Sequence, residues 1–361
     1  MVVGPHGKSF NTIRLLRTIM TTVLVIGYGS IGRRHVQNLL RFTNMKIIIL
    51  SKRKKIALDD FDLIPEKTIK HRLEISNSLQ QCILKKPQIA FVTNETSKHI
   101  LIAVKLAKLG MDLFIEKPLS NSSLGIRELK KIIQKKKLIC MIGCNFRFYP
   151  PIQKIKKLLD TQNLGKIHSI HIENGSYLPD WHPYENYIQS YASRKILGGG
   201  VTLTQIHELD YLCWFVGIPK EVTSVIDKIS TLKINVDDIN ETILKFRKSV
   251  IGVIHLDFFQ RPSFKRCKIR GSKGTLEWNS IENKINLYTS KTKKYSKIKI
   301  PHNYALTSNK VNKMYVEELQ YFFNCVKNRT QPMNNLSEAE HILNVVLSMK
   351  KSSMTKKTVK I

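Results

Sequence analysis

The stretch TTVLVIGYGSIGRRH, residues 21–35, decides the fold of this chain. Its β-branched apolar run at 23–26 is typical of a buried parallel strand. Gly27, Gly29 and Gly32 follow in the spacing G-x-G-x-x-G, and apolar residues at helical spacing come after them. A glycine-rich turn between a strand and a helix binds dinucleotide phosphates, because the backbone approaches them closely and the helix N-terminus offers free N–H groups. The sequence therefore predicts a nucleotide-binding unit at this point.

Strands and helices alternate from this unit to about residue 143. We expect strands at 23–26, 46–50, 89–93, 113–116 and 138–143, and helices at 31–41, 76–84, 97–109 and 123–136. Such alternation predicts an α/β domain with a doubly wound parallel sheet.

The pattern changes after Pro150 and Pro151. Strands then follow one another with short turns, which predicts a mostly antiparallel sheet. We expect a helix at 152–160, a strand at 167–177, a helix at 201–216, strands at 221–228, 240–247, 250–259, 266–271, 274–278 and 284–289, and helices at 311–328 and 337–351. Ser337 and Glu340 form a capping box for the last helix. The predicted domains are residues 21–145 and 146–361, after an extension at 1–20.

Net charge is the unusual feature of the composition. The 361 residues include 60 Lys plus Arg against 27 Asp plus Glu, a formal charge of +33. Such an excess raises nucleic acid or an acidic membrane as partners. However, the 45 Lys and 15 Arg are spread along the whole chain, and nucleic-acid readers favour Arg. We therefore expect neither as a specific partner, and attraction of anionic small molecules is a third explanation.

The N-terminal residues and the cysteines indicate in which cellular compartment the protein is expected. Residues 1–20 contain no acid and lack the apolar core of a secretory signal, so they are a transit peptide, a disordered tail or a mis-assigned start before Met20. No run is long enough to span a membrane. Scattered cysteines in a chain of this length indicate free thiols in a reducing cytoplasm, with no metal site. They are Cys82, Cys140, Cys144, Cys213, Cys267 and Cys325.

The fingerprint and the next strand end predict how a cofactor is held. Gly27 permits the tight turn, Gly29 the approach of a pyrophosphate, and Gly32 close packing of helix on strand. An enzyme specific for NAD usually has an acid after the second strand, but no acid stands there before Asp59. Lys52 and Arg53 stand there instead, which favours NADP over NAD, unless these two bases only reflect the general excess of Lys and Arg in the chain. The remaining candidates for binding the cofactor here are Tyr28, Ser30, Ile31, Arg33, Arg34, Ser51, Lys52 and Arg53.

Lys117 is the first candidate for chemistry. It lies in Glu116-Lys117-Pro118, at the carboxyl end of a predicted strand, where ligands of doubly wound sheets bind. A lysine there can hydrogen-bond a substrate oxygen and exchange its proton. The alternative is an ordinary surface lysine.

Four segments in order resemble the Gfo/Idh/MocA oxidoreductases, the glucose–fructose oxidoreductase and inositol dehydrogenase family. They are GYGSIGRRH (27–35), EKP (116–118), GCNFRFYP (143–150) and GGGVTLTQIHELDYL (198–212). The resemblance implies an N-terminal Rossmann domain and a C-terminal α+β domain with a large open, mostly antiparallel sheet. It implies NAD(P)-dependent oxidation or reduction at a sugar or cyclitol carbon, and dimers or tetramers formed through the open sheet.

The resemblance also implies roles for individual residues. Lys117 matches the catalytic lysine and His207 the active-site histidine. From helix spacing, Asp210 lies on the same face three residues after His207 and could orient its imidazole. Asn145 and Arg147 match the segment that lines the nicotinamide side of the cleft. We add Thr93, Asn94 and Glu116 to the cofactor-binding set. Many members carry an Asp four residues before the histidine, where this chain has Leu203, with Thr204 beside it.

The segment 177–187 mixes aromatic and polar residues, a composition suited to sugars. It looks like family members from surface-polysaccharide and nonulosonic-acid pathways, so we expect a sugar, sugar acid or nucleotide-sugar as substrate. The alternative is a packing loop at the domain junction. Because the acid before His207 is missing, the alternative function is a cofactor-binding sensor without catalysis. The candidate substrate-binding residues are Trp181, Tyr184, Arg194, Thr204 and Asp210.

Overall fold

The computed structural model describes residues 21–53, 61, 64–183, 185–298, 300 and 311–361. The expected N-terminal extension at 1–20 therefore lies outside the described residues. Among the described helices, none is long and apolar enough to cross a membrane.

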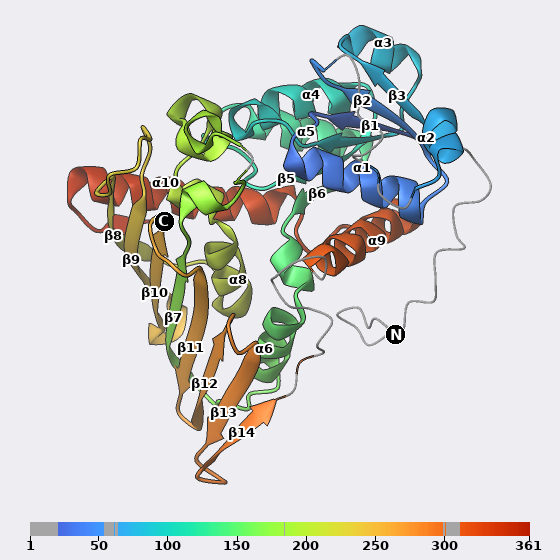
Figure 1. Ribbon diagram of the computed structural model, residues 1–361. Helices are drawn as coiled ribbons and strands as arrows, with labels where there is room; N and C mark the ends of the chain where they lie inside the picture. The colour runs from blue at the N-terminus through green and yellow to red at the C-terminus, as the bar shows by residue number, and fades with distance from the viewer. Residues whose placement is uncertain (1–20, 54–60, 62–63, 184, 299, 301–310) are drawn as a thin grey trace.

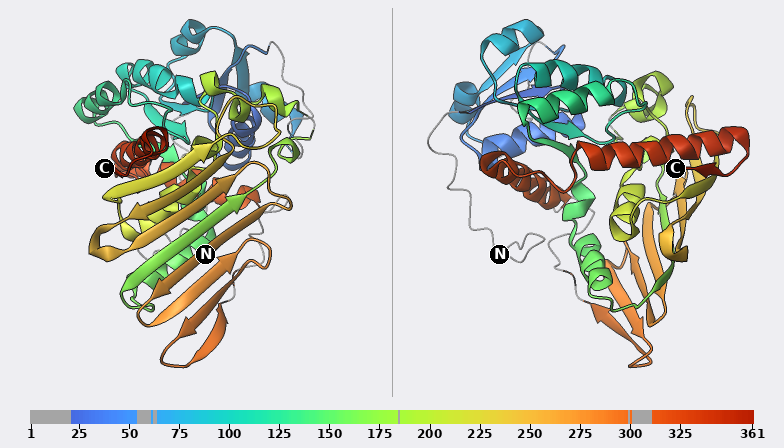
Figure 2. Two further views of the ribbon diagram at one scale, coloured as in Figure 1. Left: turned by 90° about the vertical axis from the view of Figure 1, so that its left-hand side faces the viewer. Right: turned by 180° about the vertical axis from the view of Figure 1, so that it is seen from behind.

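The first domain is built on a six-stranded sheet of parallel strands in the order β3-β2-β1-β4-β5-β6. Helices α4 and α5 cover one face and α1 the other (Figures 1 and 2). The strand order reverses between β1 and β4, and ligands of such sheets bind beyond the carboxyl ends at that point. The elements are β1 (Thr22–Ile26), α1 (Ser30–Phe42), β2 (Lys46–Leu50), α2 (Glu66–Arg72), β3 (Leu73–Ser76), α3 (Leu79–Leu84), β4 (Ile89–Val92), α4 (His99–Lys108), β5 (Asp112–Glu116), α5 (Ile126–Lys136) and β6 (Cys140–Gly143).

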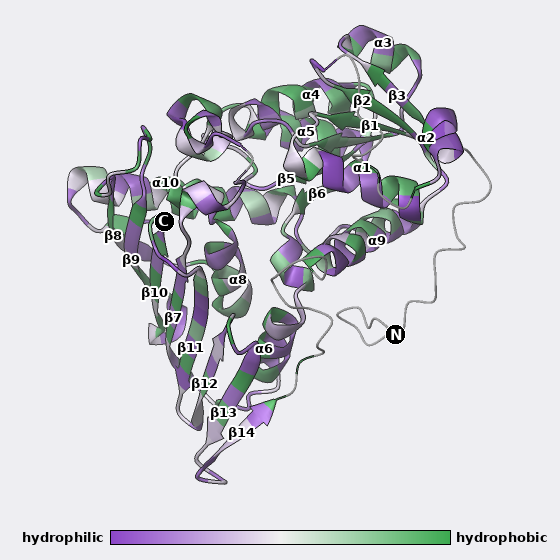
Figure 3. Cartoon of the chain, in the orientation of Figure 1, coloured by the Kyte–Doolittle hydropathy of each residue, from purple (hydrophilic) through white to green (hydrophobic). Residues whose placement is uncertain are grey.

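Burial on both faces explains the uniformly apolar strands. Val23, Leu24 and Val25 of β1 have no exposed surface. In Figure 3 the strands of this sheet are almost wholly hydrophobic, whereas hydrophobic and hydrophilic residues alternate along the second sheet. Alternation is what a sheet with one solvated face requires.

The second domain contains a nine-stranded sheet in the order β14-β13-β12-β11-β7-β10-β9-β8-β15. Only the β7–β10 pair is parallel among its described pairs. Helices α6, α8 and α10 lie on one face, and the opposite face is open (Figure 2). The elements are α6 (Pro150–Asp160), β7 (Ile167–Gly175), α7 (Val201–Thr204), α8 (His207–Val216), β8 (Glu221–Asp227), β9 (Ile239–Lys245), β10 (Ile251–Asp257), β11 (Phe264–Gly271), β12 (Gly274–Asn279), β13 (Lys284–Thr289), β14 (Lys294–Ile298), α9 (Asn312–Asn328), α10 (Leu336–Thr355) and β15 (Val359–Lys360).

Helix α9 departs from the predicted domain division. It lies against the first domain, next to α1 (Figure 1). Phe322 of α9 packs edge-on against Phe91 and Phe114 of the parallel sheet, at ring distances of 5.7 and 5.5 Å. Just after α9, Arg329 forms an ion pair of 2.6 Å with Asp112. The range 146–361 is therefore not one unit in space, because this helix supplies part of the first domain's core.

Local details also differ from the prediction. The expected helix at 76–84 is shorter, because β3 extends to Ser76, and α2, β3, β14 and β15 were not expected. The capping box was wrong: Asn335 caps α10 by accepting from the backbone N–H groups of Ser337 and Glu338. Glu340 instead pairs with Lys130 at 2.8 Å. All six cysteines are buried and free.

Candidate active site

The glycine loop has the geometry that its spacing predicts. Gly27 has a φ of +95°, and a Cβ there would stand 2.9 Å from the Cα of Asn94. A Cβ on Gly32 would press against the Gly27 carbonyl and come within 2.8 Å of the Thr93 hydroxyl. A Cβ on Gly29 would meet no atom within 4 Å, so its backbone faces open space. No described side chain caps the N-terminus of α1 beside it. An approachable backbone next to free helix N–H groups fits a bound pyrophosphate.

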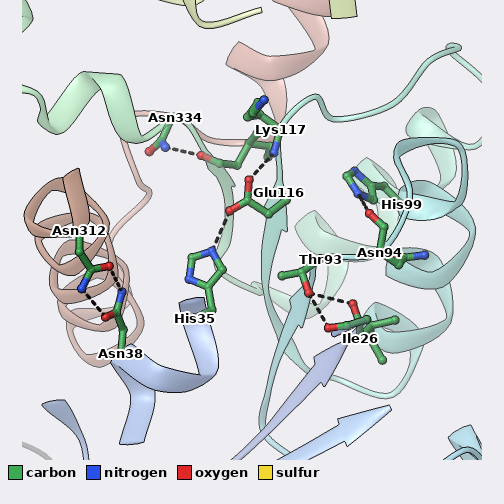
Figure 4. Close-up of polar contacts among 12 residues, drawn as sticks. Ile26, His35, Asn38, Thr93, Asn94, His99, Glu116, Lys117, Asn312 and Asn334 are labelled. Atoms are coloured by element: carbon green, nitrogen blue, oxygen red, sulfur yellow. Dashed lines mark hydrogen bonds and ion pairs between the residues drawn. The ribbon is translucent and has the colours of Figure 1, made fainter. Parts of the chain in front are cut away.

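The end of β4 holds this loop in place (Figure 4). The Thr93 hydroxyl lies 3.0 Å from the carbonyl oxygens of both Ile26 and Gly27. His99 fastens the next turn, with ring nitrogens 2.9 Å from the carbonyl oxygens of Asn94 and Pro118. The side-chain oxygen of Asn94 is buried without a partner among the described residues. An unpaired acceptor beside the phosphate-binding turn is suited to a ligand's N–H or O–H group.

Glu116 and Lys117 leave the end of β5 in different directions. Glu116 is buried, and its carboxylate lies 2.7 Å from Nε2 of His35 in α1. The backbone N–H of Lys117 donates to the same carboxylate at 3.2 Å. Glu116 thus joins the fingerprint helix to the strand that carries Lys117 (Figure 4), which positions that residue.

A break in the expected helix at 201–216 brings Lys117 to the second domain. The structure has α7 and α8 there, separated at Gln205 and Ile206. The Lys117 ammonium group donates to the carbonyl oxygen of Thr204 at 2.9 Å. In an unbroken helix that carbonyl would accept from the chain four residues on. The break frees it for Lys117 and makes His207 the first residue of α8.

His207 lies in an apolar setting beside positive charges. Its ring packs 4.8 Å from that of Phe146. Burial lowers the pKa of His207 well below its usual range, and the nearby charges of Lys117 and Lys265 lower it further. The imidazole is therefore neutral at physiological pH and can accept a proton.

Asp210 does not orient His207, contrary to the prediction. Its two carboxylate oxygens accept from the Arg147 guanidinium at 2.7 and 2.9 Å, and both side chains are buried. Arg147 also donates to the carbonyl oxygen of Met333. The structure thus directs both residues toward each other, and the two roles expected of them, cofactor binding by Arg147 and substrate binding by Asp210, gain no support from their contacts. Asn145 is buried at the start of the same turn.

The aromatic loop matches the packing alternative better than a sugar platform. The indole N–H of Trp181 donates to the Ser176 hydroxyl at 2.9 Å, and its ring stands perpendicular to Phe258 at 5.4 Å. Arg194 is exposed. Tyr184 lies outside the described residues.

The turn after β2 contains three predicted cofactor residues. The Ser51 hydroxyl accepts from the backbone N–H of Arg53 at 3.1 Å. Lys52 and Arg53 are exposed. Of the arginines that follow the fingerprint, Arg34 stacks over the ring of Tyr315 from α9 at 4.6 Å.

The sequence did not predict a cluster of polar residues that lies next to His207, between α8 and the nine-stranded sheet. Lys265 of β11 pairs with Glu208 at 2.6 Å, and the Glu208 side chain is fully buried. Gln205 donates to the Asp257 carbonyl at 3.0 Å. Glu208 and Gln205 each keep one buried oxygen without a partner in the described structure. Nothing in the sequence signals the Lys265–Glu208 pair, because its members lie 57 positions apart.

Comparison with known proteins decides the family. The NAD-binding Rossmann model of the oxidoreductase family GFO/IDH/MocA matches residues 21–144, and the family's C-terminal domain model matches 152–277. The chain belongs to the GFO/IDH/MocA oxidoreductases. The family resemblance and the fold class predicted from the sequence are thereby confirmed.

Individual relatives point to dehydrogenases. The chain is 25% identical over 288 residues to levoglucosan dehydrogenase of Pseudarthrobacter phenanthrenivorans, covering 71% of this chain and 72% of that protein. It is 24% identical over 208 residues to inositol 2-dehydrogenase of Burkholderia lata, covering 56% of each. A levoglucosan dehydrogenase structure in complex with NADH superposes with a TM-score of 0.79 at 16% identity, covering 94% of this chain and 99% of that one. These relatives favour an NAD-binding dehydrogenase acting on CH–OH groups and do not favour the sensor alternative.

Proposed function

We propose that this protein transfers a hydride between a nicotinamide dinucleotide and a carbinol carbon of a sugar or sugar-like polyol, with Lys117 and His207 as catalytic residues. One observation carries the proposal. Lys117 from the cofactor domain reaches the Thr204 carbonyl, one turn before His207 in the other domain, at 2.9 Å. A cation and a neutral base therefore meet where the carboxyl ends of the parallel strands face the second domain.

The open backbone at Gly29 and the free N-terminus of α1 fit the pyrophosphate of such a cofactor. When bound, the nicotinamide supplies the hydride acceptor or donor. The Lys117 ammonium group binds and orients the substrate hydroxyl. In the oxidative direction, neutral His207 accepts the hydroxyl proton. Burial lowers the pKa of His207, which keeps the imidazole unprotonated and leaves a ring nitrogen with a lone pair to accept.

Mutation of Lys117 tests the assignment. Lys117→Ala should lower kcat at least about 100-fold, the usual contribution of a positioned proton-transfer group, with cofactor Kd unchanged. Turnover would be measured with both cofactors on a panel of sugars and polyols that includes levoglucosan and myo-inositol. Lys105→Ala, at an exposed position of α4, is the control and should leave kcat unchanged. Wild-type turnover in Lys117→Ala would show that this lysine is not catalytic.

We propose NADP as the preferred cofactor. The turn Ser51-Lys52-Arg53 carries no carboxylate to repel a 2′-phosphate, and the exposed guanidinium of Arg53 can pair with one. Arg53→Glu should weaken NADPH binding about tenfold or more and leave NADH binding nearly unchanged. Fluorescence titration of each cofactor measures this. Equal effects on NADPH and NADH would mean that the turn does not read the 2′-phosphate.

Oligomer and location follow as further proposals. The open face of the nine-stranded sheet offers a surface on which a second copy would pack, as a homodimer or homotetramer (Figure 2). The six buried free thiols suit a reducing cytoplasm. Sedimentation velocity measures the oligomeric state directly.

A further inference from the structure

A groove at the far end of α8 has cations around its rim. It has a volume of about 870 Å³ and lies between the end of α8, β15 and α10. Lys220, Arg247, Lys351 and Lys360 line it, and all four are exposed. Segments far apart in the sequence thus bring four positive charges to one concavity, where an anion can interact with several of them at once.

These cations differ from many other lysines of the protein. Within the described residues, none of the four forms an ion pair, and no acidic side chain lines the groove. The neighbouring carboxylate of Glu221 is held by Lys245 at 2.9 Å. Lys245, and more weakly Lys360 and Lys220, lowers the pKa of Glu221. The side chains that line the groove therefore carry a net positive charge.

Part of the groove lining is apolar. Val216, Ile218 and Leu347 line the groove together with the four cations, and these three residues are partly buried, whereas the cations are exposed. A volume of about 870 Å³ falls within the range of small-molecule sites, about 300–1,000 Å³. A groove lined by both apolar side chains and cations fits a compact ligand with an apolar ring and a multivalent anionic group. A polynucleotide would require a basic stripe that continues past the groove.

We propose that this groove binds a small organic phosphate, with the phosphate on the four cations and the apolar part against Leu347 and its neighbours. The groove is separate from the candidate active site. Helix α8 runs ten residues from His207 to Val216, about 15 Å at 1.5 Å per residue. The occupant therefore does not compete with a dinucleotide on the glycine loop, and this proposal does not rest on the proposed function.

Titration of the full chain with 1-naphthyl phosphate and with tripolyphosphate, at about 0.15 M salt, tests the site. Isothermal calorimetry should show one site per chain, with and without saturating NADH. The variant Arg247→Ala/Lys351→Ala should weaken both probes about thirtyfold, which corresponds to about 1 kcal/mol of attraction in water for each of the two lost cations. Leu347→Ala should weaken only 1-naphthyl phosphate, about threefold.

The matched control is Lys135→Ala/Lys136→Ala, which removes the same charge from exposed positions of α5. It should change both Kd values less than twofold. Equal weakening by the two double variants, or several equivalent sites per chain, would overturn the proposal. The proposal would also be overturned if a 20-nucleotide single-stranded DNA displaced the probes equally from the wild type and from both double variants, because that result would show general polyanion binding.

Discussion

The two sides of the candidate active site differ in how their residues are held. On the cofactor side, Gly27, Gly29 and Gly32 act through their backbone, within one strand–turn–helix unit. On the side of α8, Arg147 binds Asp210 across 63 positions of sequence. The contrast shows that a site made of backbone can be recognised from contiguous sequence. A site made of buried side chains depends on which distant partner each one meets.

The largest expected effect tests the buried Arg147–Asp210 pair. Asp210→Ala leaves the Arg147 charge buried and unpaired, and should lower the free energy of unfolding by about 3–5 kcal/mol. Denaturant titration measures this. Asp160→Ala is the control, because Asp160 is exposed and its pair with Lys156 is worth less than about 1 kcal/mol. If Asp210→Ala kept its stability but lost turnover, the result would support the predicted role of Asp210 in substrate binding instead.

The glycine loop offers the corresponding test on the cofactor side. Gly32→Ala should destabilise the fold by about 1–3 kcal/mol, because the new methyl group presses on the Gly27 carbonyl and the Thr93 hydroxyl. Gly29→Ala meets no atom within 4 Å, so stability should stay constant while cofactor affinity falls. Thermal melts and cofactor titrations separate the two effects. Loss of stability in Gly29→Ala would show that this backbone is packed, contrary to the structure.

The smallest expected effect comes from a half-exposed contact on the nine-stranded sheet. His255 lies 2.9 Å from Asp257 and 2.5 Å from Glu241. The hydrogen bond to Asp257, helped by Glu241, raises the pKa of His255 from 6.5 to about 9. The stability that these contacts of protonated His255 contribute is fully present below pH 6.5 and is lost as the pH rises to about 9.

Between these pH values the wild type should lose about 1–2 kcal/mol of stability relative to His255→Gln, a loss that solvent screening keeps small. Urea titrations of both proteins across this pH range measure the difference. Parallel pH profiles would mean that the histidine stays neutral in the folded protein.

Sequence reasoning succeeded where structure is local. The apolar run at 23–26 and the glycine spacing specify β1, the turn and α1 because each depends on near neighbours. The break between α7 and α8 was missed, and with it the contact that it allows between Lys117 and Thr204, 87 positions apart. The cap of α10 was misassigned because the N-cap is Asn335, two residues before Ser337. The Lys265–Glu208 pair is visible only once β11 lies beneath α8.

The return of α9 to the first domain has a consequence for the order of synthesis. The ribosome makes the glycine fingerprint at residues 27–35 nearly 290 residues before it reaches Phe322. Until α9 emerges, the Phe91 and Phe114 side of the parallel sheet lacks its cover. The domain that begins first is therefore among the last to be completed, and a chain cut before residue 312 would leave its cofactor domain with an exposed apolar face.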